Sequence, residues 1–128
     1  MHASLANPSH IRNILEDIER QFIYSIMKNK NHNHVKELVF EIIEMTRELI
    51  DLGGEEESLL EKNIQYMENY LSYINENDPY IQYEIGMSHM RLKNTKNAES
   101  AFQDAFLGAG DDDQLQDTLL ALLQKYFK

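Results

Sequence analysis

The 128-residue sequence contains no cysteine, only two prolines and only five glycines. Without cysteine the chain forms no disulfide, offers no thiolate nucleophile and holds no cysteine-ligated zinc or iron–sulfur cluster. The low proline and glycine content excludes the collagen-like and proline-rich linker classes. With 42% apolar and 27% charged residues, the composition is typical of a globular protein. The length predicts a single helical domain over residues 1–128.

Basic residues are also scarce. Lysine and arginine number 12 against 22 aspartates and glutamates, so the formal net charge is −10. This balance argues against binding to nucleic acid or to an anionic membrane surface, and it favours a cationic or neutral partner. No apolar run is long enough to span a bilayer, and the first residues lack the basic start and apolar core of a secretory signal. We therefore expect a cytoplasmic protein.

The acidic residues are concentrated in the middle of the chain. Residues 37–84 hold thirteen of the acids but only two bases, Arg47 and Lys62, which gives this segment a charge of −11. Two interpretations are open. The acids form a solvated helix face with an acidic loop, or they form the docking surface of an electropositive partner. A docking surface of this kind, with Glu55, Glu56 and Glu57 in a row, would raise association rate and selectivity more than affinity.

Apolar residues recur at helical spacing, and no segment alternates in the manner of a strand. The sequence therefore predicts an all-α fold of about six amphipathic helices. Their expected ranges are 9–28, 34–52, 58–76, 79–93, 95–107 and 112–127. The connections are short, so consecutive helices are expected to be antiparallel neighbours that form a core by stacking as hairpins.

Several expected helix ends follow from local chemistry. Asn7 or Ser9 is suited to cap the first helix, and Asp78 precedes Pro79 at the start of the fourth. Ser58 stands three residues before Glu61, which is the spacing of a capping box for the third helix. The pair Gly53-Gly54 is expected to end the second helix, because glycine accepts the left-handed backbone conformation beyond a helix C-terminus.

Residues 79–110 resemble a tetratricopeptide repeat (TPR), a helix–turn–helix unit of about 34 residues with small and large residues at set places. The matching residues are Ile85, Gly86, Ala98, Phe102 and Ala105. Their chemistry suits the resemblance, since Gly86 and Ala98 permit two antiparallel helices to approach closely while Phe102 fills the space between them. The sequence departs from the family pattern at two positions, with His89 where an aromatic residue is usual and Gly110 near the usual helix-starting proline.

The resemblance implies a protein-binding scaffold whose concave surface is lined by the first helix of each repeat. Helices 34–52 and 58–76 look like a second, divergent hairpin, and helix 112–127 looks like the solvating cap of such an array. The partner-binding residues implied on helix 79–93 are Tyr80, Tyr83, Met87, Met90 and Arg91. Aromatic residues, methionine and arginine are enriched at interfaces. The alternative is that Tyr83 and Met87 face the core.

The polar side chains offer no convincing catalytic or metal site. His2, His10, His32 and His34 lack the spacing of three or four residues that places two ligands on one helix face. His89 stands alone on its helix and is interpreted as a packed or groove-lining residue. The run Asp111–Asp113 lacks the ligand spacing of a calcium loop and is interpreted as a helix cap. We expect no enzyme activity, no metal and no cofactor.

The sequence thus predicts a non-enzymatic, TPR-like adaptor that docks a basic or amphipathic protein partner. Residues 78–113 are similar to the repeats of two subfamilies, namely the small immunity proteins of bacterial polymorphic toxins and the TPR chaperones of type III secretion. An immunity protein is the first specific hypothesis and a secretion chaperone the second. A third hypothesis, from a different class, is a structural subunit that homo-oligomerises through the apolar stripes of helices 9–28 and 58–76.

Overall fold

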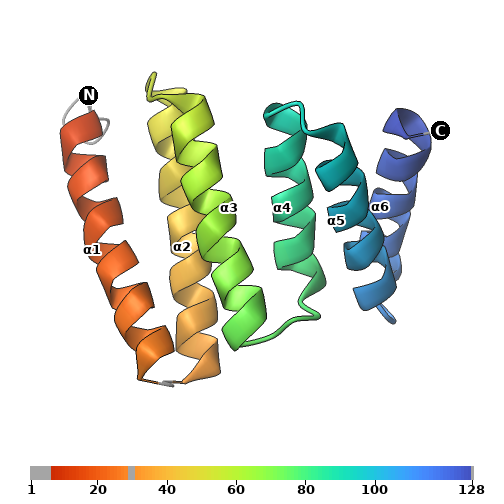
Figure 1. The fold of residues 1–128 in the computed structure, drawn as a ribbon, viewed down its shortest axis with the longest axis horizontal. Helices are drawn as coiled ribbons and strands as arrows, with labels where there is room; N and C mark the ends of the chain where they lie inside the picture. The colour runs from red at the N-terminus through yellow and green to blue at the C-terminus, as the bar shows by residue number, and fades with distance from the viewer. Residues whose placement is uncertain (1–6, 29–30, 128) are drawn as a thin grey trace. The chain divides into compact units, whose positions relative to one another are not determined.

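The computed structural model describes residues 7–28 and 31–127, which fold into helices joined by short connections (Figure 1). The helices are α1 (Pro8–Met27), α2 (His32–Asp51), α3 (Glu56–Tyr73), α4 (Pro79–Arg91), α5 (Thr95–Gly108) and α6 (Asp113–Tyr126). No described residue belongs to a β-strand, so the predicted all-α class with six helices is confirmed. Of the helices described, none has both the length and the apolar character needed to cross a membrane.

Short polar side chains cap four of the helices. Asn7, Asn31 and Asp78 each accept hydrogen bonds from two backbone N–H groups in the first turn of α1, α2 and α4. Asp112 accepts one such bond at the start of α6. These side chains satisfy N–H groups that have no partner inside the helix, and each contributes about 1 kcal/mol to stability.

Two helices begin two residues earlier than expected. Helix α2 begins at His32 rather than at residue 34, because Asn31 caps it two residues earlier. Helix α3 covers Glu56–Tyr73 rather than 58–76, so Ser58 lies inside the first turn and the predicted capping box is wrong. Glu56 and Glu57 occupy that first turn, where a negative charge interacts favourably with the positive end of the helix.

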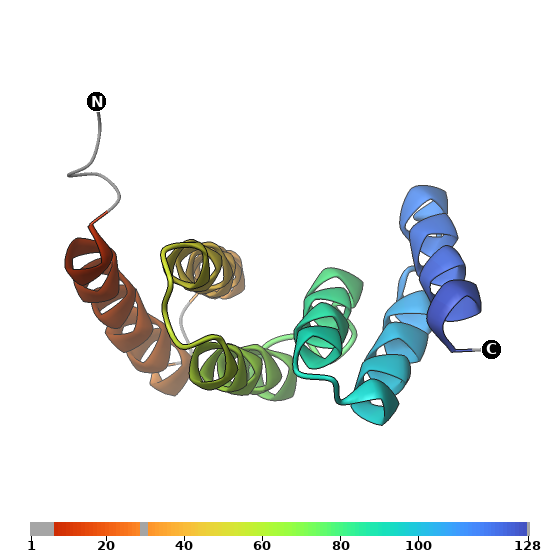
Figure 2. The ribbon, with the colours of Figure 1, turned by 90° about the horizontal axis from the view of Figure 1, so that it is seen from above.

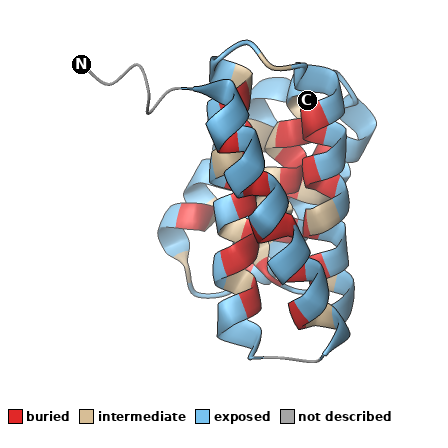
Figure 3. Cartoon of the chain, turned by 90° about the vertical axis from the view of Figure 1, so that its left-hand side faces the viewer, coloured by how far each residue is buried: buried red, intermediate tan, exposed pale blue. Residues whose placement is uncertain are grey.

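The chain divides into two compact units at a boundary within α3. Unit 1 is Met1–Tyr66 and unit 2 is Met67–Lys128. In both units the buried residues form stripes along the helices, and exposed residues occupy the rest of each helix surface (Figure 3). This pattern is the one that amphipathic helices produce when each buries one side.

Unit 1 is organised by α1 and α2, which pack closely along each other. Phe22, Val39 and Ile42 have no exposed surface at all, and the ring of Tyr66 meets that of Phe22 edge-on with centroids 5.6 Å apart. We expected helix 34–52 to pair with helix 58–76. The close backbone packing of this unit is instead between α1 and α2.

Unit 2 contains the hairpin predicted from residues 79–110. Helix α4 packs along α5, and α5 packs along α6 (Figure 2). Its buried cluster comprises Ala98, Phe102, Ala105, Ala109, Leu115 and Leu119. Gly86 is buried on α4, and a Cβ placed there would lie only 2.5 Å from the ring of Phe102. The predicted role of Gly86 in a close helix approach is therefore confirmed.

Candidate functional site

The five residues implied as a partner-binding surface on α4 have different environments. Tyr83, Met87 and Met90 are partly buried and pack against the apolar cluster of α5 and α6. The rings of Tyr83 and Phe102 have centroids 6.1 Å apart. These three side chains were expected to contact a partner, but they contact neighbouring helices instead. For Tyr83 and Met87 this agrees with the alternative that they face the core.

The other two predicted residues lie on the surface at opposite ends of α4. Tyr80 is in the first turn with 44% of its surface exposed, and its hydroxyl donates a hydrogen bond to the carboxylate of Asp112. This bond raises the pKa of Tyr80 and lowers that of Asp112. Arg91 is exposed in the last turn. The structure thus does not gather the five residues into one open face.

The acidic run predicted to steer a partner belongs to unit 1. Glu55 precedes α3, and Glu56 and Glu57 lie in its first turn, with all three residues exposed. Their position at a helix N-terminus gives them a structural role, since the helix dipole favours negative charge there.

A shallow groove runs along the outer surface of α2 in unit 1. Its lining residues are Asn33, Lys36, Glu37, Phe40, Glu41 and Glu44. Phe40 is only half-buried, and the three glutamates of this groove are exposed. The groove therefore combines one aromatic contact with excess negative charge, and it is wide open to solvent.

Unit 2 carries a second groove, which we call the polar groove. It is lined by Glu68, Leu71, Gln82, Ile85, His89, Asn97, Ser100, Ala101 and Asp104. Its volume is about 310 Å³. These residues come from the end of α3, one side of α4 and one side of α5. The groove continues past Gln82 and Asp104 into a second hollow beside Asn77, Leu107 and Gly108.

The polar groove contains polar atoms that the fold leaves unsatisfied. The side-chain nitrogen Nδ1 of His89 and the oxygen Oε1 of Gln82 are buried, and neither has a hydrogen-bond partner among the described residues. The amide of Gln82 is held in place because its Nε2 donates a hydrogen bond of 3.1 Å to the carbonyl of Glu76. Buried polar atoms without a partner are rare in folded proteins, and each costs about 1–3 kcal/mol.

Charge in the polar groove is negative. Glu68 on α3 and Asp104 on α5 contribute carboxylates, and no lysine or arginine is among the residues that line the groove. Burial lowers the pKa of His89, while the nearby Glu68 carboxylate opposes this effect. The imidazole is therefore neutral near pH 7, and one of its ring nitrogens is available as an acceptor.

From the sequence His89 was interpreted as a packed or groove-lining residue without an acid at useful spacing. The accompanying groups lie on other helices, with Glu68 21 positions before His89 and Asp104 15 positions after it. No spacing rule within one helix connects such residues. The sequence held one weaker indication of this groove. Gln82, Ile85 and His89 lie on one side of α4, and this side is not the one that the TPR resemblance implied for partner binding.

The histidines do not assemble a metal site within residues 7–28 and 31–127, where no three histidine, aspartate or glutamate side chains converge on a common point. His32 and His34 are exposed at the start of α2, and His10 is exposed in the first turn of α1. His2 lies outside the described residues. The run Asp111–Asp113 surrounds the N-terminus of α6, where Asp112 acts as the predicted cap.

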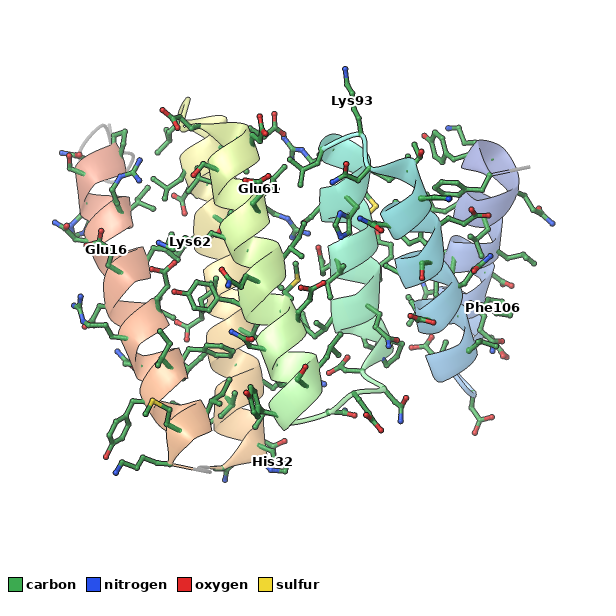
Figure 4. The ribbon with its side chains drawn as sticks, in the orientation of Figure 1. Glu16, His32, Glu61, Lys62, Lys93 and Phe106 are labelled. Carbon is green, nitrogen blue, oxygen red and sulfur yellow. The ribbon has the colours of Figure 1, made fainter. Side chains whose placement is uncertain are left out.

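One buried ion pair lies between α1 and α3 in unit 1. The Nζ of Lys62 is 3.4 Å from Oε1 of Glu19, whose side chain is 8% exposed while that of Lys62 is 53% exposed. Figure 4 shows Lys62 directed toward α1. Burial raises the pKa of Glu19, and the attraction of Lys62 only partly offsets this. The pair links α1 to α3.

Comparison of the sequence with protein-family models, curated proteins and solved structures finds no match.

Proposed function

We propose that this protein is a non-enzymatic adaptor that binds a basic segment of a protein partner. The observation that supports this function is the polar groove of unit 2. Its lining contains two exposed carboxylates, those of Glu68 and Asp104, and no lysine or arginine. Such a lining attracts cationic hydrogen-bond donors and repels phosphate, in accord with the net charge of −10.

The acidic surface of unit 1 supports the same function. The groove beside Phe40 and the exposed run Glu55–Glu57 together enlarge the area of negative potential. Charges of this kind accelerate encounter with a basic protein and select against acidic ones. The polar groove would then provide the short-range contacts, and the acidic residues of unit 1 the long-range attraction.

The specific form that we propose is a toxin-neutralising immunity protein. That role requires a folded basic partner bound tightly and with strong salt dependence. A secretion chaperone is the alternative within the same class, and it requires an extended amphipathic segment bound more weakly. The identity and folded state of the partner distinguish the two roles.

The test begins with capture of the partner by the tagged protein from a lysate of its own host. The partner is then purified, and its dissociation constant is measured by calorimetry across a salt series for the wild type and for Asp104→Asn. Asp117→Asn, which removes the same charge from an exposed position on α6, is the matched control. We expect weaker binding at high salt and in Asp104→Asn only. A dissociation constant that changes neither with salt concentration nor in Asp104→Asn would contradict the proposal.

A second candidate function is that of a structural subunit that homo-oligomerises. It is favoured by large apolar side chains that are exposed near the end of α1. Ile23, Tyr24 and Met27 are 45%, 55% and 76% exposed. Large exposed apolar patches often mark contact surfaces. Light scattering on the purified protein tests this function, since a subunit gives a defined oligomer that Met27→Gln weakens, whereas the adaptor gives a monomer.

A further inference from the structure

We infer that the polar groove of unit 2 is a receptor for an arginine side chain in the basic segment of the partner. This inference rests on the proposed function and specifies the chemistry of its ligand. Three observations support it, namely the kinds of atom that line the groove, the arrangement of the apolar residues among them, and the size of the hollow.

The lining atoms select a hydrogen-bond donor with positive charge. Glu68 and Asp104 supply carboxylate oxygens, Gln82 supplies a carbonyl oxygen without a partner, and neutral His89 can supply a ring nitrogen as an acceptor. The orientation of the Gln82 amide is not free to reverse, because its Nε2 already donates to the carbonyl of Glu76. Glu68 and Asp104 are exposed, so a ligand that donates several hydrogen bonds can pair with both carboxylates, while the buried atoms of Gln82 and His89 are closed to solvent.

The distribution of the acceptors favours guanidinium over ammonium. The two accessible carboxylates lie on different helices, Glu68 on α3 and Asp104 on α5, so a ligand that pairs with both has to present donors in more than one direction. A guanidinium group carries five N–H donors in a planar fork, whereas a lysine ammonium is a compact charge with stronger hydration. The planar group therefore reaches more of the acceptors and is removed from water at a lower cost.

The apolar lining completes the match. Leu71, Ile85 and Ala101 lie among the polar residues of the groove. They provide surface against which the methylene groups of an arginine and the flat face of its guanidinium can pack. The volume of about 310 Å³ is at the lower end of the roughly 300–1,000 Å³ range of small-molecule pockets. The hollow is therefore large enough for one arginine side chain.

The experiment titrates the isotopically labelled full-length protein with three probes, followed by NMR. The probes are N-acetyl-arginine amide, N-acetyl-lysine amide and N-acetyl-citrulline amide, the last of which keeps the shape of arginine without its charge. For arginine we expect saturable shifts centred on Ile85, His89 and Ala101. We expect lysine to bind at least several-fold more weakly and citrulline to show no saturable binding.

Variants separate the groove from the general acidity of the protein. Removing one charged acceptor should weaken arginine binding by about tenfold or more, since a hydrogen bond to a charged group has at least that effect. We expect this loss in Asp104→Asn and in Glu68→Gln, and no loss in Asp117→Asn. Equal loss in Asp117→Asn, equal binding of lysine or citrulline, or shifts spread over all acidic surfaces would each overturn the inference.

The result can be separated from that of the proposed function. If the captured partner binds in a salt-dependent way but arginine does not enter the groove, the inference fails and the adaptor function stands. If arginine binds in the groove but no protein partner is found, the site stands and the adaptor function fails.

Discussion

Gly86 on α4 lies directly against the aromatic ring of Phe102 on α5, where an added Cβ would stand 2.5 Å from Cε1 of the ring. Phe102 has no exposed surface, so its ring cannot move aside into solvent. We expect Gly86→Ala to lower the free energy of unfolding by about 1 kcal/mol. Overpacking costs roughly 1–3 kcal/mol and exceeds the helix-propensity gain of about 1 kcal/mol. Urea denaturation followed by circular dichroism measures this change.

A smaller residue at position 102 provides the control for this prediction. In a Phe102→Leu background the ring is absent, and we expect Gly86→Ala to be neutral or stabilising relative to that background. An equal cost of Gly86→Ala in both backgrounds would show that the ring contact is not the cause.

The Gly86–Phe102 contact also indicates how much of the fold could be predicted. A small residue facing a large one at repeat spacing is encoded locally, and so are the caps Asn7 and Asp78. The start of α3 was missed because Ser58 and Glu61 form a plausible capping box in isolation. Helix α2 ends in a turn at Gly53, which has a φ of +95°. This short turn lets α3 begin at Glu56, two residues earlier than expected.

The candidate site was less predictable than the fold. Helix α4 carries apolar residues on more than one side, so the sequence alone could not decide which side faces its neighbours. Packing against α5 and α6 occupied Tyr83 and Met87 and left Gln82 and His89 facing the polar groove. The side of α4 that faces each neighbour is a tertiary property, and the residues that complete the groove come from α3 and α5.

Tyr70 and Asp78 form a buried hydrogen bond that connects the end of α3 to the cap of α4. The phenol donates to Oδ2 of Asp78 across 3.1 Å, and both residues are 2% exposed. We expect Tyr70→Phe to lower the free energy of unfolding by about 1–3 kcal/mol, because the buried carboxylate loses one of its donors. Tyr73→Phe is the matched control, since Tyr73 is 68% exposed, and thermal or urea unfolding of both variants gives the comparison. Equal effects of the two changes would contradict this role.

Glu19 gives a pH dependence of stability with a defined sign. Burial raises its folded-state pKa above the ordinary value of 4.5, so the folded protein holds this proton more tightly than the unfolded chain. The contribution of Glu19 to stability therefore falls as the pH rises from 4.5 through the folded-state pKa. Glu19→Gln cannot titrate, and we expect its stability relative to wild type to increase across that window and then level off.

Urea denaturation at a series of pH values measures this difference. Glu48→Gln is the control, because Glu48 is exposed on α2. A stability difference between Glu19→Gln and wild type that does not change with pH would show that burial of Glu19 does not govern its ionisation.

The acidic run at the start of α3 is expected to affect the rate of partner association. Replacing Glu55, Glu56 and Glu57 with lysine should slow association with a basic partner, and the effect should be largest at low salt because exposed charges are screened within about 10 Å at 0.1 M. Stopped-flow association measurements across a salt series test this expectation. Three exposed acids of unit 2 (Asp111, Asp113 and Asp117) changed to lysine give a control of equal charge. An unchanged rate at every salt concentration would contradict steering by this run.

Met87 distinguishes a packing role from a binding role for the apolar side of α4. It packs against the α5–α6 cluster, and loss of a fully buried methionine costs about 2–5 kcal/mol. Because Met87 is only partly buried, we expect Met87→Ala to lower the free energy of unfolding by about 1–2 kcal/mol. Leu107→Ala is the control, since Leu107 is 79% exposed and its loss should cost little. Urea denaturation of both variants measures the two costs.

The partner's affinity for Met87→Ala separates the two roles. If Met87→Ala keeps its stability but no longer binds the partner, this side of α4 is the binding surface that the TPR resemblance implied. If Met87→Ala is destabilised but still binds the partner, the partner binds on another surface, as we expect for binding at the polar groove.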